Sequence, residues 1–323
     1  MKMGGNYLAI LGVTTVTTVM SCSPAKKEYA SFELYPVRTG SLTEMEYTPL
    51  ATKFYLWSPT AEEVRLMLYD AGEGGHAYET VKMEPTEDGT WTTSVDKNLL
   101  GKFYAFNVKI NDKWQGDTPG INAHAVGVNG KRAAIIDWKT TNPEGWESDR
   151  RPSLKSPADM IIYEMHHRDF SVDSTSGIKN KGKYLAFTEG GTKINSDTSA
   201  SSVSTAADYL VKSGINCVQL MPVYDFGSVD ETITGSATNR NWGYDPVNYN
   251  VPEGSYSSNP YDGNVRITEF KQMIQALHDR GISVVMDVVY NHTYVTEGSC
   301  FTDTVPNYYY RKTSSSVYSN GSG

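Results

Sequence analysis

From residue 160 onward the chain alternates short apolar runs with helical segments, and this order restricts the possible folds more than any other feature. Three runs are rich in Ile, Val, Leu and Met: residues 160–166, 215–222 and 282–289. Between them, apolar residues recur at helical spacing over residues 203–213 and 265–280, and each pattern ends at a glycine, Gly214 or Gly281. Strands that alternate with helices favour a parallel sheet, so we predict a β-α-β-α-β unit.

Polar residues at the end of the third run are candidates for function. In a (β/α)8 barrel, functional side chains lie at the carboxyl ends of the strands. Asp287 lies inside the third apolar run, and Asn291 and His292 follow it. A carboxylate there needs a partner, because burying an unpaired charge costs several kcal/mol. Spacing alone allows two readings of Asp287, a functional carboxylate or a structural residue that caps a loop.

The preceding part of the chain has an all-β pattern. Four segments rich in β-formers are separated by turn residues: residues 53–57, 64–69, 89–95 and 102–110. Their regular spacing predicts a β-sandwich. Trp57, Trp91 and Trp114 could be flat platforms that stack on sugar rings, or core residues of the sandwich. Packing is the favoured interpretation for each of them.

The first 22 residues are typical of an export signal. Lys2 precedes a mildly apolar, threonine-rich stretch that ends in Ser21-Cys22, which resembles the bacterial lipoprotein box. We therefore expect a lipid on Cys22 and a tether over residues 23–46, with an ordinary cleaved secretory signal as the alternative. The stretch is short and polar for a membrane span. The expected location is an exported, membrane-anchored lipoprotein, periplasmic or at the cell surface.

Composition excludes several other classes of protein. The chain has a net charge of −8 and no dense run of Lys and Arg, so nucleic acid is not an expected partner. A count of only three cysteines argues against a disulfide framework. Cys22, Cys217 and Cys300 lie far apart in the sequence and show no zinc-binding spacing. Cys217 lies within an apolar run and is expected in the core. No metal site is predicted from these residues.

The motifs of the second half resemble one enzyme family. Residues 287–292, Asp-Val-Val-Tyr-Asn-His, resemble the first signature region of glycoside hydrolase family 13, the α-amylase superfamily. Residues 241–257, which begin Asn-Trp-Gly-Tyr-Asp-Pro, are similar to the type I pullulanase branch of that family, and residues 162–171 match its first barrel strand. Residues 54–66 resemble the opening of the family 48 carbohydrate-binding module, which precedes the barrel in many such enzymes.

This resemblance implies the domain order. An immunoglobulin-like β-sandwich over residues 47–149 is expected to precede a (β/α)8 TIM barrel that begins in residues 150–323. The barrel is expected to be incomplete, stopping after its third strand, because such a barrel takes about 250 residues. The likeness extends from about residue 47 to the end of the chain.

The resemblance also implies roles for five residues of a substrate-binding site. Tyr244 is expected to stack on the sugar ring at the subsite where the bond is cleaved. Asp287 is expected to order that subsite through hydrogen bonds, His292 to bind the same sugar, and Asn291 to support the loop. Trp242 is expected either to form a wall of the cleft or to pack structurally.

Other positions near these motifs are expected to have lesser roles. Asp245, in front of a proline, is interpreted as a turn residue. His166 and His167 are interpreted as structural or rim residues. Arg240 stands where the branch usually has Tyr, which changes the edge of the expected cleft.

The expected reaction is hydrolysis of α-1,6 branch linkages in pullulan, amylopectin or glycogen, with retention by double displacement. It needs two carboxylates about 5–5.5 Å apart. In the family these follow the fourth and fifth strands, so no catalytic residue is expected within the chain, and the chain alone is expected to be inactive.

Several alternatives to this reading stay open. They are a non-catalytic α-glucan-binding protein, a truncated gene product, and a sister activity such as isoamylase or branching enzyme. No cofactor is expected to be required. Calcium is compatible with the family, although no Asp-dense loop has the familiar spacing.

Overall fold

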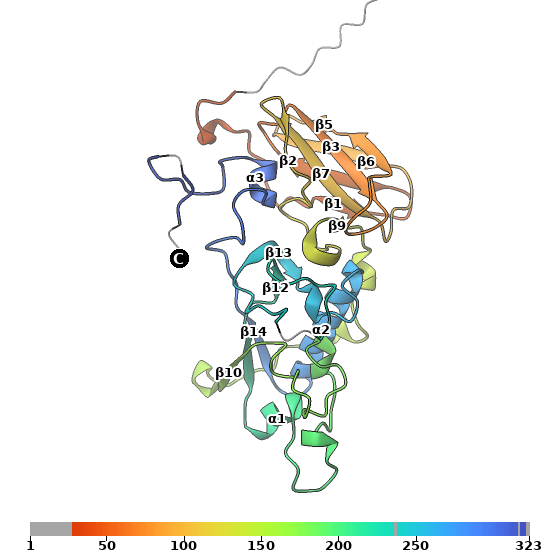
Figure 1. Cartoon of the computed structure of the whole chain (residues 1–323), viewed down its shortest axis with the longest axis vertical. Coiled ribbons are helices and arrows are strands. Elements are labelled where there is room, and N and C mark those ends of the chain that lie inside the picture. Colours follow the sequence, from red (N-terminus) through yellow and green to blue (C-terminus); the bar gives the residue numbers. More distant parts are fainter. Residues whose placement is uncertain (1–27, 236–237, 316, 321–323) are drawn as a thin grey trace, which may run out of the picture.

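The computed structural model describes residues 28–235, 238–315 and 317–320. The expected export signal and Cys22 lie outside these residues. Figure 1 shows a β-sandwich at one end of the molecule and an α/β unit at the other, with strands β12 and β13 between them. An immunoglobulin-like sandwich followed by part of a barrel is therefore the fold of the chain, as the sequence predicts.

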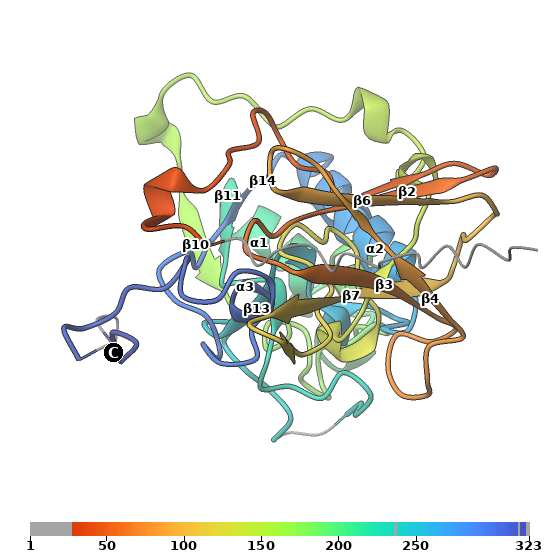
Figure 2. The same ribbon diagram turned by 90° about the horizontal axis from the view of Figure 1, so that it is seen from above.

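The sandwich consists of two antiparallel sheets, seen as two layers in Figure 2. The first sheet contains, in order, β1 (Met45–Tyr47), β2 (Thr52–Trp57), β6 (Thr90–Val95) and β5 (Glu84–Pro85). The second contains β4 (Glu79–Lys82), β3 (Glu63–Tyr69), β7 (Phe103–Ile110) and β8 (Lys113–Trp114), and β9 (Ala133–Ala134) pairs with β7. Every second residue of β3 (Val64, Leu66 and Leu68) is fully buried between the sheets, as period-2 alternation requires.

The three tryptophans of the sandwich have packing partners. Trp91 is buried and donates its indole N–H to the Ser58 carbonyl at 3.0 Å. Trp57 is half-buried and donates to the Pro36 carbonyl at 3.1 Å, and the Arg65 guanidinium carbon lies 4.0 Å from the Trp114 ring centroid. These contacts favour packing over sugar stacking for all three.

A buried carboxylate lies at the start of the sandwich. Glu44 is only 2% exposed and accepts hydrogen bonds from the backbone N–H groups of Ile121 at 3.1 Å and Asn122 at 3.0 Å. A Cβ on Gly120 would lie 2.1 Å from a Glu44 oxygen, so glycine is required for this close approach. Burial raises the pKa of Glu44 from 4.5 to about 8.

Glu44 should make stability depend on pH. The pKa of Glu44 is higher in the folded state than in the unfolded state. Its contribution to the free energy of unfolding is therefore fully present below about pH 4.5 and is lost as pH rises through 8. Between pH 5 and 8.5, we expect the free energy of unfolding to fall by several kcal/mol more in the wild type than in Glu44→Gln. This follows because each unit of pKa difference corresponds to about 1.4 kcal/mol. Urea unfolding followed by tryptophan fluorescence measures this difference. Parallel pH profiles of the two proteins would contradict the assignment.

The α/β unit contains a three-stranded parallel sheet in the order β10 (Ile162–Met165), β11 (Cys217–Leu220) and β14 (Ser283–Met286). Helices α1 (Ala206–Lys212) and α2 (Gly263–His278) connect the strands. Gly214 and Gly281 both adopt a φ of +77° just after these helices, which explains why the helical patterns end at glycine. The predicted β-α-β-α-β order is confirmed, and Cys217 is buried in the sheet.

The helices cover one face of this sheet. Met165, Val218 and Leu220 share a core with Phe270 and Leu277 of α2. Several apolar side chains elsewhere on the sheet and just beyond its strand ends are exposed: Ile161, Ile162, Val285, Met286 and Val288. In the part of the chain that the structure describes, the sheet is thus a section of barrel wall. The helices cover one of its faces, and apolar side chains elsewhere on the sheet and at its strand ends are exposed.

Part of the segment expected to be loop forms a second small sheet. Strands β12 (Tyr224–Phe226) and β13 (Pro246–Pro252) pair antiparallel, with register shifts on both sides of Asp225. Helix α3 (Cys300–Thr304) follows the third barrel strand and contacts the sandwich through β7. The sequence did not predict this sheet because β12 has only three residues and both strands carry Asp, Asn or Pro.

Short 3₁₀ helices complete the described structure: η1 (Phe32–Leu34), η2 (Val128–Gly130), η3 (Trp138–Thr140), η4 (Trp146–Ser148), η5 (Pro157–Asp159), η6 (Tyr184–Phe187), η7 (Ile194–Ser196) and η8 (Gly254–Tyr256). The segment between the two units lies along α2, where Asp149 bonds His278 at 2.8 Å and Lys271 donates to Thr141 at 2.8 Å. In the part of the chain that the structure describes, no helix combines the length and apolarity that a membrane crossing requires.

Candidate functional site

Tyr244 and Asp287 meet at the carboxyl end of the parallel sheet. Asp287 follows β14, and its backbone N–H donates to the Leu220 carbonyl at 3.1 Å, which continues the ladder with β11. The Tyr244 hydroxyl donates to Asp287 Oδ2 at 2.8 Å. Burial, together with this carboxylate, raises the pKa of Tyr244 to about 12, so the hydroxyl keeps its proton at neutral pH.

His292 holds the backbone of Tyr244 from the other side. Asn291 Nδ2 lies 2.8 Å from His292 Nδ1, and His292 Nε2 lies 2.5 Å from the Tyr244 carbonyl. Because Asn291 donates to Nδ1, the ring proton is on Nε2 and is donated to that carbonyl. The Tyr249 hydroxyl donates to the His292 carbonyl. Four predicted site residues, Tyr244, Asp287, Asn291 and His292, are therefore brought together.

Trp242 lies beside this group on a tight turn. Its side chain is 61% exposed in the part of the barrel that the structure describes. The next residue, Gly243, has a φ of +92°, and a Cβ there would lie 2.2 Å from the Pro222 carbonyl oxygen. The turn is anchored by His166 Nε2, which lies 2.7 Å from the Asn241 carbonyl. A role for Trp242 as a cleft wall stays a prediction.

Neighbouring histidines and charges support the loops. His167 is buried among the rings of Tyr184, Phe187 and Tyr256, and burial lowers its pKa to about 3, so the ring is neutral. This environment agrees with a structural role. Arg240, the departure from the family pattern, forms an ion pair with Asp169 at 2.5 Å.

The geometry suits a neutral sugar. An aromatic ring can stack on the C–H face of a pyranose, while the carboxylate of Asp287 can accept bonds from hydroxyl groups. The donor Nε2 of His292 is engaged by the Tyr244 carbonyl, so His292 orders the Tyr244 loop in this structure. The expectation that His292 itself binds sugar stays a prediction.

A buried cluster of charges behind the site was not anticipated from the sequence. Arg266 of α2 is fully buried and bonds Asp225 at 3.1 Å and Glu231 at 2.9 Å. Its Nη2 also donates to the Gly127 carbonyl of the sandwich at 3.2 Å. One signal pointed to it. The buried residues of α2 are 263, 266, 267, 269, 270, 273 and 277, and a charged side chain among them requires buried partners.

This cluster joins the two units of the fold. Glu231 accepts a bond from Asn129 N at 2.8 Å, and Asn129 Oδ1 accepts one from Glu231 N at 2.9 Å. Asn248 Nδ2 donates to the Gly130 carbonyl at 3.0 Å. A Cβ on Gly130 would lie 2.2 Å from Asp225 Oδ2, which explains the glycine. The η2 turn of the sandwich is thus anchored on the β12–β13 sheet.

Calcium does not fit this cluster, although Asp225, Glu231 and Glu253 lie close enough to surround an ion. The Arg266 guanidinium supplies the positive charge, and N–H groups already donate to the carboxylates, including Phe226 N to Glu253 at 3.1 Å. Burial raises the pKa of Asp225 to about 7 and that of Glu253 well above its usual range. Because the guanidinium already balances these carboxylates and N–H donors occupy their oxygens, they are poor ligands for a divalent cation.

Two family models match the chain. The model described as carbohydrate-binding module 48 (isoamylase N-terminal domain) matches residues 44–125, and the model of the α-amylase catalytic domain matches residues 190–317. These matches fall on the sandwich and on the α/β unit.

Sequence relatives agree with the family models. The chain is 38% identical over 277 residues to the pullulanase of Bacillus subtilis (strain 168), covering 86% of this chain and 36% of that protein. It is 31% identical over 315 residues to the chloroplastic pullulanase 1 of Arabidopsis thaliana, covering 85% of this chain and 32% of that protein. The chain thus spans about a third of the length of these relatives.

Solved structures show the same likeness. A pullulanase from Paenibacillus barengoltzii, in complex with maltohexaose and α-cyclodextrin, has a TM-score of 0.85 and 43% identity, covering 91% of this chain and 44% of that one. A pullulanase from Bacillus acidopullulyticus has a TM-score of 0.82 and 45% identity, and the match covers 90% of this chain and 34% of that one.

Proposed function

This chain belongs to the pullulanase group of glycoside hydrolase family 13, and we propose that it provides the substrate-binding wall for hydrolysis of α-1,6-glucosidic linkages. The substrate class is a branched α-glucan such as pullulan, amylopectin or glycogen. The reaction proceeds with retention, through a nucleophile and an acid supplied by later barrel strands. The part of the site that the structure describes contributes glucan binding.

The observation that carries this proposal is the bond from the Tyr244 hydroxyl to Asp287 at 2.8 Å. It brings an aromatic ring and a carboxylate together at the end of the sheet where barrel enzymes bind their substrates. His292 and Asn291 hold that ring's backbone through a second set of bonds. A structural Asp that only capped a loop would not require an aromatic partner 43 positions away.

Two measurements test the proposal. The DNA downstream of the Gly323 codon should continue into strands that bear an Asp nucleophile and a Glu acid, and a polypeptide encoded by that whole frame should release oligosaccharides from pullulan. The 323-residue chain should be retained in a pullulan gel without forming product. An immediate stop codon together with unaltered gel mobility would rule out both hydrolysis and glucan binding. Retention with an immediate stop codon would support a binding protein instead.

We further propose that Cys22 carries a lipid and that the protein is anchored to a bacterial membrane after export. The Ser21-Cys22 motif supports this proposal. Cells fed radiolabelled palmitate should label the wild-type protein, and Cys22→Ser should lose the label and leave the membrane fraction. Cys217→Ser is the matched control, because this cysteine is buried in the sheet. Equal labelling of wild type and Cys22→Ser would contradict the anchor.

A further inference from the structure

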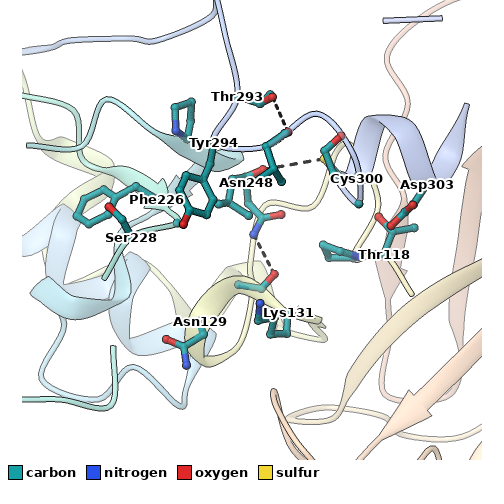
Figure 3. A pocket seen from close by; sticks show the side chains of 18 of the residues that line it. Thr118, Asn129, Lys131, Phe226, Ser228, Asn248, Thr293, Tyr294, Cys300 and Asp303 are labelled. Atoms are coloured by element: carbon teal, nitrogen blue, oxygen red, sulfur yellow. Dashed lines mark hydrogen bonds between the residues drawn. The ribbon is translucent and has the colours of Figure 1, made fainter. Parts of the chain in front are cut away.

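A cavity of about 700 Å³ lies between the sandwich and the α/β unit. Three stretches of chain line it: the sandwich turns around Thr118 and Asn129, the β12–β13 sheet, and the segment from Thr293 to Asp303. Figure 3 shows Tyr294, Phe226 and Ser228 on one side of the cavity and Thr118 and Asp303 on the other. Its volume lies within the range of about 300–1,000 Å³ typical of ligand pockets.

An aromatic platform is built into the wall of this cavity. Tyr294 is 48% exposed, and its backbone N–H donates to the Pro246 carbonyl at 2.9 Å. Its ring lies directly over Gly227, where an added Cβ would come within 2.1 Å of the ring. A glycine that leaves room for a half-exposed ring keeps one face of the ring supported and leaves the rest available to a ligand.

The polar groups of the lining select the class of ligand. Among the described residues that line the cavity are three aspartates, Asp117, Asp230 and Asp303, and one lysine, Lys131. Excess negative charge disfavours phosphates and other anions. The mixture of carboxylates, hydroxyls and amides disfavours a purely apolar ligand. Such a ligand would remove water from these polar groups without replacing the hydrogen bonds that water makes. A neutral polyhydroxylated ligand satisfies both conditions, since its hydroxyls donate to carboxylates and its C–H faces stack on tyrosine.

We propose that this cavity is a second α-glucan subsite, separate from the Tyr244–Asp287 site and able to connect the sandwich to the barrel wall. The inference rests on the proposed function for the identity of the sugar. Neither Tyr244 nor Asp287 lines the cavity, yet Tyr294 follows His292 by two residues and Pro246 follows Tyr244 by two. Both sites are therefore built from the same two loops. A glucan chain held in the cavity would stabilise the loops that position Tyr244.

Site-resolved footprinting of the full 323-residue chain tests this proposal, with maltohexaose as the probe. Hydroxyl-radical labelling followed by mass spectrometry reports the protection of individual tyrosines. We expect maltohexaose to protect both Tyr244 and Tyr294 in the wild type, and Tyr294 to stay protected in Tyr244→Ala. Val295→Trp places a large ring in the cavity without removing a polar group. It should raise the apparent Kd of maltohexaose, measured from the protection of Tyr294, about tenfold. Val203→Trp is the matched control, because Val203 is similarly exposed but lies away from the cavity.

The outcomes separate this inference from the proposed function. Protection of Tyr244 without Tyr294 overturns the second subsite and leaves the cleft intact. Protection of Tyr294 without Tyr244 supports the cavity and argues against the cleft. Absence of protection at both tyrosines overturns both. The wild-type measurement decides these cases even if Val295→Trp fails to fold.

Discussion

Replacing Arg266 with Met should lower the free energy of unfolding by about 3–5 kcal/mol. The guanidinium is fully buried and is paired with Asp225 and Glu231, while Glu253 lies in the same cluster. Removing the cation leaves Asp225 and Glu231 without their counter-charge, and each must then take up a proton or remain buried as an unpaired charge. Because Arg266 also donates to Gly127, the variant should loosen the contact between sandwich and barrel wall as well.

Urea denaturation near pH 7 measures this loss, with separate probes for the two units because a two-domain chain need not unfold in one step. The control is Arg280→Met, a partly exposed arginine 3.9 Å from Asp208, which should cost less than about 1 kcal/mol. Adding Asp225→Asn and Glu231→Gln to Arg266→Met should recover part of the loss. Adding calcium should leave the wild-type midpoint unchanged. A strong calcium-dependent shift would show that the cluster is a cation site after all.

Asp287→Asn should lower kcat/KM on pullulan about 10²–10³-fold in a polypeptide that carries the complete barrel. Asparagine keeps the size of the side chain but removes the negative charge that accepts the Tyr244 hydroxyl at 2.8 Å. Hydrogen bonds to a carboxylate are roughly twice as strong as neutral ones. A carboxylate near the developing positive charge of an oxocarbenium-like transition state stabilises it more than it stabilises the bound substrate.

Two tyrosine variants distinguish charge from simple positioning. Tyr244→Phe removes the bond to Asp287 but keeps the ring, so it should cost about tenfold, much less than Asp287→Asn. Tyr209→Phe, on the partly exposed α1 helix, should leave activity unchanged. Circular dichroism confirms that each variant is folded. Full activity of Asp287→Asn would assign this residue to loop capping, the alternative that spacing left open.

Much of the fold was predictable because its signals are local. The third strand could be predicted from residues 282–289 alone, although this prediction placed Asp287 inside the strand, whereas β14 ends at Met286 and Asp287 follows it. Glycines 214 and 281 marked the helix ends, and both adopt the positive φ that this role requires. The alternation of β3 likewise predicted its buried face.

The contact of Tyr244 with Asp287 came from family resemblance rather than from spacing. The two residues are 43 positions apart. The loops that carry them have no repeating pattern of apolar residues from which their contact could be predicted. The β12–β13 sheet, whose strands flank Tyr244 in the chain, was predicted to be loop because it carries residues that favour turns. It is held by tertiary contacts, such as the bond from Asn248 to Asp225.

The sequence by itself determined the order of strands and helices, the faces that are buried, and the residue types available at the strand ends. Only the tertiary structure decided which of these residues meet. Arg266 finds Asp225 on β12, Glu231 on the loop that follows it, and its carbonyl partner Gly127 on the sandwich. Tyr294 forms a cavity wall only because Gly227 lies beneath it. Periodicity follows from the local geometry of the backbone, whereas charge pairing and cavities depend on distances between segments that are remote in the chain.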